Sequence, residues 1–534
     1  MMETHISWVL LTGEYAYKIK KPVNLGFLDF TSLGMRRYYC EEELRLNRRL
    51  APGLYLDVVE IRGDARAPRI GGTGPLLEYA VKMREFPQAG LASRALADGT
   101  FGAVDIDCLA GLVAEFHART PAAAAPDRLG APETILSAAR QNFDQLRTRM
   151  KPEPDAKKLR SLREWTEREF AAMRETFAAR KRGGFVRECH GDLHLGNIAM
   201  IEGKPVPFDC IEFNDELRWI DVISEVAFTV MDLEDRQRGD LAWRFLNRYL
   251  EATGDYPGVR LLRFYFVYRA LVRAKVHLMR ARQPRLARAA KSRLLRAFRG
   301  YLKLAERFTV PSGACLFITH GLSGCGKTTA TQPLIELLGA VRLRSDVERK
   351  RLHGLAPLAG SKSGLNAGIY TPEANDSTYR RLGELAQGIL AAGYSVVVDA
   401  TFLKRAERET FRAIAEQCDA RLVILNFLAP LEILRARIVE RKTRADDASE
   451  ADLAVLQRQV AVREPLTPAE MAAAFAVDGT RPVSREMWTP LIERLRVLQR
   501  ASRGAGHRPD PAAPLFPADA EETATPGAPR PLWP

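Results

Sequence analysis

The feature that most constrains the fold is the segment from Gly321 to Thr328, Gly-Leu-Ser-Gly-Cys-Gly-Lys-Thr, which has the spacing G-x-x-x-x-G-K-[ST]. An apolar, strand-like run, 314–319, comes directly before it. Glycines in such a loop let consecutive backbone N–H groups surround a phosphate, and the helix that follows presents its positive end. Lys327 neutralises phosphate oxygens there, and the Thr328 hydroxyl reaches Mg²⁺. The pattern predicts a parallel α/β sheet and a bound nucleotide, held by Gly321, Ser323, Gly324, Cys325, Gly326, Lys327, Thr328 and Thr329.

Two later strand-like runs end in carboxylates. Residues 341–343 are followed by Arg-Ser-Asp346, and residues 395–398 are followed by Asp399. Side chains at the carboxyl ends of parallel strands lie in the crevice where a substrate binds. We therefore expect Asp346 to meet an acceptor and Asp399 to support Mg²⁺ or its water ligands.

Arginines recur along the helix predicted after the strand 421–428. Arg437 and Arg441 are four residues apart, share one helix face and are candidates for stabilising transition-state charge. Arg435 and Arg444 flank them, and a charged loop, 442–450, follows. This pattern predicts a lid over the phosphates, and the alternative is a solvated helix face.

The other half of the chain carries a second chemical signature in residues 188–214. His190, Asp192 and Asn197 have the spacing H-x-D-L-x-x-x-N, and an apolar run then leads to Asp209. Phosphoryl transfer to a hydroxyl needs a carboxylate that receives the proton and oxygen ligands for Mg²⁺. Asp192 fits the first role, and Asn197 with Asp209 fits the second. The spacing is that of the protein-kinase catalytic loop, with Asp209 in the place of the D-F-G aspartate.

The N-terminal segment predicts two strands, 8–11 and 15–19. Lys18 and Lys20 lie on one face of the second strand because side chains alternate. In kinase-like folds a lysine on this strand holds the α- and β-phosphates and pairs with a glutamate on the next helix. The predicted helix 35–50 offers Glu41, Glu42 and Glu43, of which we favour Glu43. No G-x-G-x-x-G precedes Trp8, so the usual first strand and phosphate-covering loop are expected to be absent or reduced to residues 1–7.

Length and composition predict more than one domain. The chain has 534 residues, 46% of them hydrophobic. We expect an α+β domain at 1–308 (an N-lobe to about 82, then a C-lobe), an α/β domain at 309–500 and a disordered Pro/Ala-rich tail at 501–534. The 7 scattered cysteines predict neither a disulfide framework nor a zinc site. Neither a signal peptide nor a membrane span is apparent, so a cytoplasmic location is expected.

The charge balance leaves two classes of partner open. The net charge is +14, and much of the excess falls at 260–307, where Arg and Lys alternate with apolar residues at helical spacing. We favour helices with a basic solvated face over a nucleic-acid surface, since nucleotide phosphates also need cations.

Both halves resemble known families. The H-G-D variant of the catalytic loop resembles the aminoglycoside/choline-kinase branch of the kinase-like fold, in which an aspartate at the position of Asp221 commonly braces the catalytic loop. The second half resembles P-loop kinases such as zeta toxins, polynucleotide kinase and gluconate or shikimate kinases. The whole chain, including the segments 3–8, 17–22 and 27–30, resembles a bacterial family that joins an aminoglycoside-phosphotransferase-like domain to a P-loop, AAA-type domain.

The resemblance implies ATP and Mg²⁺ as cofactors and transfer of the γ-phosphate to a hydroxyl of a small-molecule acceptor. It does not imply antibiotic resistance, since no acidic cluster for a polycation is recognisable. One alternative is that only the P-loop half is catalytic and the other half is a binding or regulatory module. Another is a nucleic-acid end kinase. The sequence leaves both acceptors, the coupling of the sites and the oligomeric state open.

Overall fold

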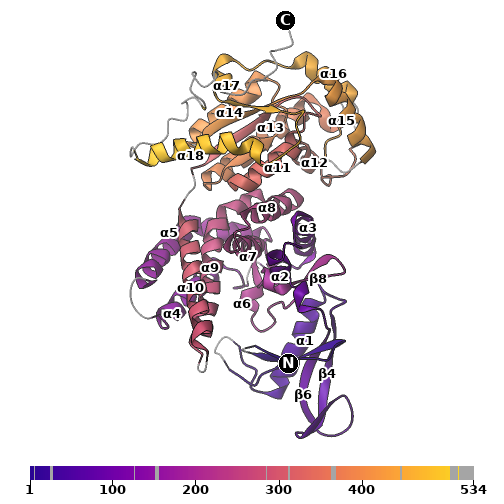
Figure 1. Cartoon of the computed structure of the whole chain (residues 1–534), viewed down its shortest axis with the longest axis vertical. Coiled ribbons are helices and arrows are strands. Elements are labelled where there is room, and N and C mark those ends of the chain that lie inside the picture. The colour runs from indigo at the N-terminus through magenta and orange to yellow at the C-terminus, as the bar shows by residue number, and fades with distance from the viewer. Residues whose placement is uncertain are drawn as a thin grey trace. The chain divides into compact units, whose positions relative to one another are not determined.

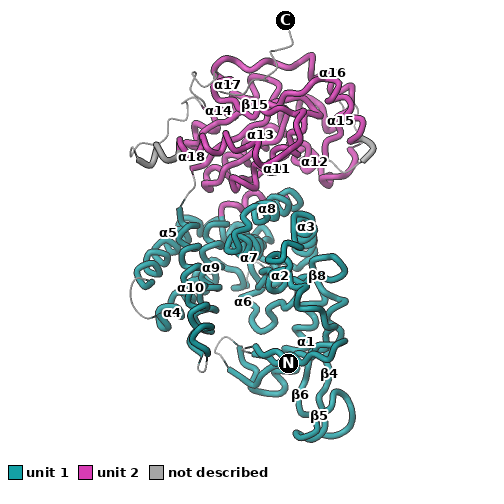
Figure 2. The backbone as a smooth tube through the Cα atoms, in the orientation of Figure 1, with its two compact units in different colours: residues 1–253, 261–310 teal, residues 254–260, 311–534 magenta. Residues whose placement is uncertain are grey.

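The computed structural model describes residues 1–4, 6–24, 28–124, 127–150, 155–283, 286–310, 313–361, 368–444, 448–504 and 515. The chain divides into two compact units (Figure 2). Unit 1 comprises residues 1–253 and 261–310, and unit 2 comprises residues 254–260 and 311–534. Within the described residues, no helix combines the length and the apolar character that crossing a bilayer requires.

Unit 1 begins with a six-stranded sheet in the order β1-β2-β3-β6-β4-β5, and each neighbouring pair is antiparallel (Figure 1). Its strands are β1 (Met2–Glu3), β2 (Ser7–Leu11), β3 (Tyr15–Lys20), β4 (Tyr55–Asp64), β5 (Ala67–Ile70) and β6 (Leu76–Arg84). Helix α1 (Leu33–Asn47) packs on β4 and β6. The expected reduced start is therefore a two-residue strand that pairs with β2.

The rest of unit 1 is mainly helical. Its helices are α2 (Ala92–Ala97), α3 (Ala103–Arg119), α4 (Pro132–Arg147), α5 (Asp155–Arg182), α6 (Asp215–Arg218), α7 (Val222–Asp235), α8 (Gly239–Thr253), α9 (Leu262–Ala281) and α10 (Arg288–Thr309). Two antiparallel pairs interrupt them, β7 (Val186–Glu188) with β10 (Trp219–Asp221) and β8 (Ile198–Ile201) with β9 (Lys204–Pro207). Helix α7 is buried over almost its whole length, because Val, Ile, Phe and Met cover most of its surface.

Unit 2 is built on a five-stranded, all-parallel sheet in the order β12-β13-β11-β14-β15. The strands are β11 (Cys315–His320), β12 (Val341–Arg344), β13 (Val396–Asp399), β14 (Arg421–Leu428) and β15 (Ala474–Asp478). The central strands are buried on both faces and consist of continuous apolar runs, as parallel strands do.

The helices of unit 2 connect and cover these strands (Figure 1). They are α11 (Lys327–Leu338), α12 (Ser345–Leu352), α13 (Pro372–Ala391), α14 (Arg405–Gln417), α15 (Leu431–Arg444), α16 (Leu453–Val462), α17 (Pro468–Ala472) and α18 (Thr489–Gly504). Helix α18 extends four residues past the expected boundary at 500. Most of the expected tail lies outside the described residues, but Leu515 is buried in the unit 2 core, so the tail cannot be treated as wholly unpacked.

Candidate active sites

Lys18 lies at the centre of the first candidate site, in unit 1. The burial of β3 alternates, so Lys18 and Lys20 both point to its buried face. Lys18 Nζ lies 2.7 Å from Glu43 Oε1 and 2.5 Å from Asp209 Oδ1. Of the three glutamates considered on α1, Glu43 is the buried one that contacts this lysine.

A second lysine completes a buried charge network around Glu43. Lys20 Nζ lies 2.8 Å from Glu43 Oε2 and also pairs with Glu212. Burial raises the pKa of Glu43, but Lys18 and Lys20 outweigh it and lower that pKa to about 2. Glu43 is therefore an anion that fixes both lysines. Glu212 was not among the predicted site residues, although it lies within the segment 188–214, three residues after Asp209.

Asp192 and Asn197 of the catalytic loop contact each other, as their spacing predicts. Asn197, at the end of the turn η2 (Leu195–Asn197), donates from Nδ2 to Asp192 Oδ2 at 2.9 Å and to the Asp192 carbonyl at 3.0 Å. The side chain of Asp192 remains 35% exposed and lies 3.5 Å from His194 Nε2. Burial raises the pKa of Asp192, but His194, Arg273 and His190 outweigh it and hold the pKa below its ordinary value. Asp192 is therefore ionised and able to accept a proton.

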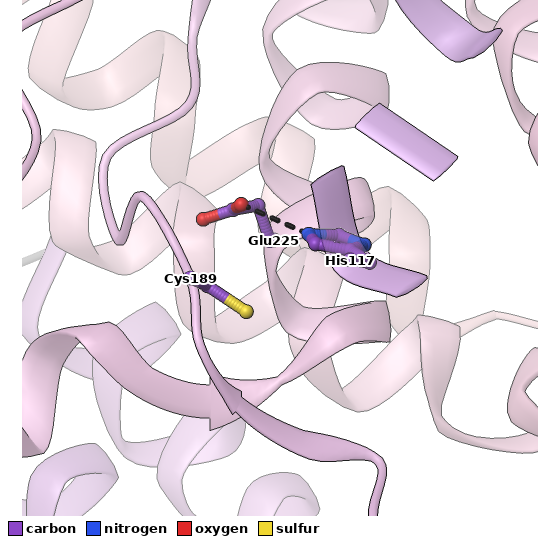
Figure 3. Close-up of side chains that lie close together, drawn as sticks. All are labelled: His117, Cys189 and Glu225. Atoms are coloured by element: carbon purple, nitrogen blue, oxygen red, sulfur yellow. Dashed lines mark hydrogen bonds and ion pairs between the residues drawn. The ribbon is translucent and has the colours of Figure 1, made fainter. Parts of the chain in front are cut away.

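Glu225 on α7, drawn with its neighbours His117 and Cys189 in Figure 3, contacts the backbone of the catalytic loop. Its carboxylate accepts the backbone N–H of His190 at 3.1 Å and that of Gly191 at 2.6 Å. His117 Nε2 lies 3.0 Å from the same carboxylate. Gly191 has φ 88, and a Cβ there would lie 2.8 Å from the Leu217 carbonyl, so the loop requires glycine.

This arrangement corrects the expected role of Asp221. Its carboxylate accepts from Arg180 at 2.7 and 2.8 Å and caps the start of α7 through the N–H of Ile223. Asp221 therefore anchors α5 to α7, and Glu225, one turn later, contacts the loop instead. Nothing in the sequence distinguished Glu225 from the other polar residues of α7.

His117, Cys189 and Glu225 also have ligand atoms within 4.8 Å of one another, close enough to share a metal ion. The Glu225 carboxylate is already engaged by two backbone N–H groups and His117, and His117 Nδ1 lies 2.9 Å from the Tyr249 hydroxyl. Burial raises the pKa of the Cys189 thiol well above its ordinary value, which disfavours the thiolate that a metal needs. The cluster fits a structural brace better than a metal site.

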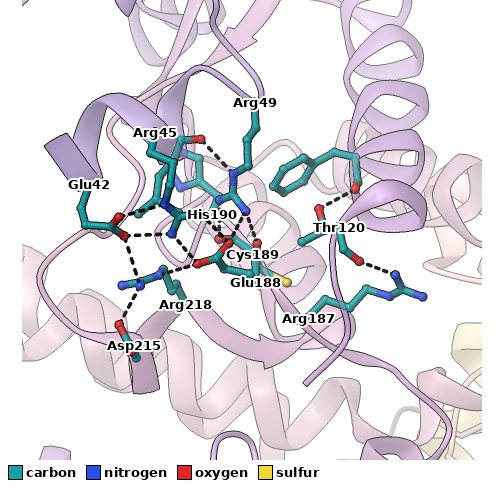
Figure 4. Close-up of polar contacts among 12 residues, drawn as sticks. Glu42, Arg45, Arg49, Thr120, Arg187, Glu188, Cys189, His190, Asp215 and Arg218 are labelled. Atoms are coloured by element: carbon teal, nitrogen blue, oxygen red, sulfur yellow. Dashed lines mark hydrogen bonds and ion pairs between the residues drawn. The ribbon is translucent and has the colours of Figure 1, made fainter. Parts of the chain in front are cut away.

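Glu188 connects α1 to the start of the catalytic loop (Figure 4). Its carboxylate lies 2.8 Å from Arg45 Nη2, 3.1 Å from Arg49 Nη1 and 3.2 Å from Arg218 Nε. Arg45 lies on α1, the helix that carries Glu43, and Arg49 lies two residues after the last residue of that helix. The network therefore links the helix that carries Glu43 to the strand that leads into His190 and Asp192.

Asp209 follows β9 in a conformation that few residues adopt. Its φ is 66, its N–H donates to the Tyr55 hydroxyl at 3.1 Å, and its side chain is 43% exposed. The N–H of Phe208 donates to the Asn197 carbonyl at 2.9 Å, which brings Asn197 and Asp209 to the same end of the β8–β9 pair. This end of the strand pair therefore carries one amide and one carboxylate side chain, and both are ligand types that Mg²⁺ accepts.

The second candidate site, in unit 2, is the glycine-rich loop between β11 and α11. Gly324 and Gly326 have φ values of 85 and 84, and a Cβ on Gly324 would lie 2.9 Å from the Leu434 carbonyl. Lys327 Nζ bends back to the carbonyls of Gly321 and Leu322, at 3.1 and 2.9 Å. The loop therefore has the wrapped shape that its glycines permit. The side chain of Cys325 is buried in the core of unit 2.

The strand-end carboxylates lie beside this loop. Arg344 and Asp399 are register partners at the ends of β12 and β13, and Asp346, two residues after Arg344 at the start of α12, lines the same pocket as Asp399. Thr328 Oγ1 donates to Asp399 Oδ2 at 2.6 Å. A pocket of about 570 Å³ opens here, and its lining includes Ser323, Gly324, Gly326, Lys327, Thr328, Thr329, Asp346, Asp399, Arg437 and Arg441.

The expected lid is described only in part. Arg437 and Arg441 project from α15 into the pocket lining, and Arg441 Nη2 donates to the Ala451 carbonyl at 2.8 Å. The side chain of Arg444 and residues 445–447 lie outside the described residues. Sequence analysis missed Gln459 on α16, whose side-chain amide accepts the N–H of Ser323 at 2.8 Å and donates to its hydroxyl at 3.0 Å.

Several further residues that line the pocket were not predicted. They are Arg349 on α12, Tyr370 just before α13, Tyr379 on α13, and Thr401, Leu403 and Lys404 after β13. Phe402, behind the pocket, is fully buried and has φ 46. Its N–H donates to the Tyr379 hydroxyl at 3.2 Å and its carbonyl accepts from Arg408 Nη1 at 3.1 Å.

Comparison with known proteins identifies both units. Residues 103–262 match the model of the phosphotransferase enzyme family, and residues 316–466 match an AAA domain model. An uncharacterized protein of Mycobacterium tuberculosis is 31% identical over 448 residues, which are 84% of this chain and 87% of that protein. A Mycobacterium bovis protein matches equally. The chain belongs to the family that joins these two domains.

We refer to it as the phosphotransferase–AAA family, and its two-domain organisation confirms the predicted fold class. Among solved structures, a gluconokinase from Sinorhizobium meliloti is 22% identical and covers 36% of this chain and 98% of its own, with a TM-score of 0.26. A choline/ethanolamine kinase family protein from Mesorhizobium loti is 12% identical and covers 56% of this chain and 89% of its own, with a TM-score of 0.33.

The two sites of this phosphotransferase–AAA protein contain the kinds of hydrogen-bond donors and oxygen ligands that a nucleotide with Mg²⁺ would need. The unit 2 loop offers backbone N–H groups and Lys327 for phosphates, with Thr328 and Asp399 as oxygen ligands. The unit 1 site offers Lys18 for phosphates, with Asn197 and Asp209 as oxygen ligands.

Proposed function

We propose that this protein is an ATP-dependent phosphotransferase with two nucleotide sites, one in each unit. Each site transfers the γ-phosphate of ATP to a hydroxyl group of a small-molecule acceptor in the cytoplasm. Both units belong to families of phosphate-handling enzymes, which supports the reaction type. The acceptor hydroxyl and the activity of both sites are the parts that require testing.

In unit 1, Asp192 takes the proton of the acceptor hydroxyl. Its pKa is held below the ordinary value, so it is ionised before the acceptor arrives. Asn197 restrains its carboxylate, while Glu225 fixes the backbone that carries it. Lys18 neutralises phosphate oxygens and is itself oriented by Glu43. Mg·ATP, when bound, supplies the transferable phosphoryl group and a metal charge, for which Asn197 and Asp209 are the ligands.

In unit 2, Lys327 and the loop N–H groups hold phosphates, and Arg437 and Arg441 face the same space from α15. Thr328 and Asp399 are the groups that would hold Mg²⁺. Asp346 accepts the proton of the acceptor hydroxyl. Fixed cations aimed at the transferring group stabilise its charge without reorganisation during the reaction.

The observation that most strongly supports the proposal is that residues from three separate elements line the 570 Å³ pocket of unit 2. Thr328 from the glycine-rich loop contacts Asp399 at the end of β13, and Asp346 at the start of α12 lines the same pocket. The proposed nucleotide-binding residues and the proposed proton acceptor thus line one cavity, an arrangement that supports phosphoryl transfer to an acceptor hydroxyl.

The test uses the full chain, Lys327→Ala and Asp209→Asn. Asparagine is chosen at Asp209 because it tolerates a positive φ, which alanine does not. Mg·ATP binding is measured by calorimetry and ATP turnover is measured with and without an ultrafiltered metabolite extract. Each substitution should remove one separable share of binding and of extract-dependent turnover. If Lys327→Ala removes everything and Asp209→Asn changes nothing, unit 1 is not a second enzyme.

That last outcome corresponds to a second candidate function, in which unit 1 binds a metabolite and regulates unit 2. One observation favours it. Strand β1 has only two residues, and the first glycine of the chain is Gly13, so residues 1–12 provide no glycine-rich loop to cover phosphates. Binding of an ATP analogue to the Lys327→Ala protein separates the two candidates, because only a nucleotide site in unit 1 retains it.

A further inference from the structure

Arg349 is a buried cation without a partner anion in the unit 2 pocket. It is 7% exposed, and its guanidinium contacts the Ile369 carbonyl at 3.4 Å, Asn375 Oδ1 at 3.1 Å and the ring of Tyr370 at 5.3 Å. Its Nε atom is buried and has no hydrogen-bond partner. Within the part of the chain that the structure describes, no carboxylate forms an ion pair with Arg349.

The neighbouring cations of α12 are different. Lys350 Nζ lies 3.0 Å from a Glu450 carboxylate oxygen, and Arg351 pairs with Glu348 on the same helix. A buried charge is costly unless an opposite charge compensates it, and Lys350 and Arg351 follow this rule. Arg349 is thus the exception in this helix, and it is the one of these three that lines the pocket.

The position of Arg349 relative to Asp346 indicates what kind of molecule would neutralise the charge of Arg349. The two residues are three apart on α12, so their side chains are neighbours on one helix face, about 5–6 Å apart at Cβ. Both line the pocket. A molecule whose hydroxyl meets Asp346 can therefore place a negative group on Arg349 only a few bonds away.

Arg349 is also separate from the groups assigned to the nucleotide. The phosphate-facing cations stand on the glycine-rich loop and on α15, whereas Arg349 is anchored to Ile369 and to Asn375 at the start of α13. The neutral hydrogen-bonding residues Asn375, Tyr379 and Thr401 line the same pocket, together with the carboxylates of Glu407 and Glu450. Burial raises the pKa of Glu407 above its ordinary value.

We propose that the acceptor of unit 2 is a small anion that carries the reacting hydroxyl together with a carboxylate or a phosphate monoester bound by Arg349. The planar guanidinium suits both groups, because it can donate two parallel hydrogen bonds to either. In the reaction, the acceptor oxygen bonds to the γ-phosphorus, the bond to ADP breaks and the hydroxyl proton passes to Asp346. The anionic group remains unchanged and positions the hydroxyl. The inference rests on the phosphotransferase function proposed for unit 2.

The experiment uses the full chain carrying Asp209→Asn, so that turnover reports on unit 2. An ultrafiltered metabolite extract is separated on an anion exchanger into a neutral flow-through and a retained anionic fraction. We expect the retained fraction alone to stimulate ATP turnover. Pretreatment with alkaline phosphatase then separates the two sources: stimulation is lost for a phosphate monoester and kept for a carboxylate.

Arg349→Gln and Arg349→Lys are compared with Arg380→Gln, which removes an exposed arginine from α13. For Arg349→Gln we expect the amount of anionic fraction that gives half-maximal turnover to rise on the order of 100-fold, with Mg·ATP affinity and the thermal unfolding temperature retained. The amount that gives half-maximal turnover of Arg349→Lys should lie between the values for Arg349→Gln and the parent. The amount for Arg380→Gln should equal that of the parent.

Two results would overturn the inference while the proposed function stands: stimulation by the neutral fraction, or an Arg349→Gln protein that responds to the anionic fraction as the parent does. If neither fraction stimulates turnover while Mg·ATP binds normally, the phosphotransferase function of unit 2 itself fails, and the acceptor inference fails with it.

Discussion

The hydroxyl of Thr328 lies 2.6 Å from the carboxylate of Asp399, although 71 residues separate them in the chain. A hydroxyl and a carboxylate at this distance can share one Mg²⁺ ion when the hydroxyl proton turns away. The contact joins the glycine-rich loop to the end of β13, so a single cation bound there restrains both elements.

Asp399→Asn should therefore weaken metal-dependent binding in unit 2. We expect the ATP affinity in Mg²⁺ to fall about tenfold or more, and the difference between Mg²⁺ and EDTA to shrink, because an amide replaces the anionic ligand. Calorimetry on the Asp209→Asn background measures both values. Thr410→Val, which alters an exposed helix hydroxyl bonded only to the Ala406 carbonyl, is the control. An unchanged Mg²⁺ dependence would remove Asp399 from the metal site.

Asp192→Asn should stop proton transfer in unit 1 without disturbing nucleotide binding. On the Lys327→Ala background, we expect extract-dependent turnover to fall by a factor of about 10²–10⁴, the usual contribution of a general base. Because the pKa of Asp192 is held below its ordinary value, the parent activity should show no acid limb from this group between about pH 5 and 8. Retained turnover in the variant would assign the base to another residue.

Asp221→Asn tests the structural role that the Arg180–Asp221 contact assigns. Both side chains are buried, so leaving Arg180 without its anion should lower the free energy of unfolding of unit 1 by about 3–5 kcal/mol. At a temperature where the variant is folded, turnover should match the parent. Asp240→Asn breaks the partly exposed pair with Arg238 and should cost less than about 1 kcal/mol. A folded but inactive Asp221→Asn protein would contradict this assignment.

Glu225 should make unit 1 sensitive to acid. Burial raises its pKa, but His117, His190 and the N–H of Gly191 outweigh it and lower the pKa to about 2, from 4.5 in the unfolded chain. A lowered pKa means that its stabilisation, on the order of 3 kcal/mol, is complete above pH 4.5 and is lost as the pH falls toward 2.

The urea midpoint of unit 1, followed by circular dichroism across this pH range, measures the effect. Glu225→Gln should have a lower midpoint at neutral pH and a flatter dependence between pH 4.5 and 2. Glu175→Gln changes an exposed carboxylate on α5 and should leave the slope unchanged. Equal slopes for Glu225→Gln and the parent would show that Glu225 is not ionised in the folded protein.

Residues inside short motifs could be located from the sequence because their spacing alone sets their geometry. Lys327 and Thr328 follow the glycines within one loop, and Asn197 reaches Asp192 across a single turn. The strand-end rule also indicated that Asp346 and Asp399 face one crevice, and both line the unit 2 pocket, since the register of β12 and β13 aligns the ends of the two strands.

The contacts that sequence analysis missed join distant elements. Gln459 lies 136 residues from Ser323, and Glu225 lies 34 residues from Gly191. Their positions depend on how helices pack on a sheet or loop, and no local spacing encodes that. Arg349 was missed for another reason: its sequence neighbours are also charged. Within the described residues, its lack of an ion-pair partner and its place in the pocket lining distinguish it from the paired Lys350 and Arg351.

The backbone of Phe402 has a consequence for attempts to make this protein more heat-resistant. A bulky residue at φ 46 costs about 1–3 kcal/mol, and here the Tyr379 hydroxyl and Arg408 hold it in place. Substitutions that relax this peptide unit are attractive for thermostability. They also remove its hydrogen bond to the hydroxyl of Tyr379, which lines the unit 2 pocket. Heat tolerance and substrate fit therefore compete at residue 402, and a stabilised variant selected there should be screened for lost turnover.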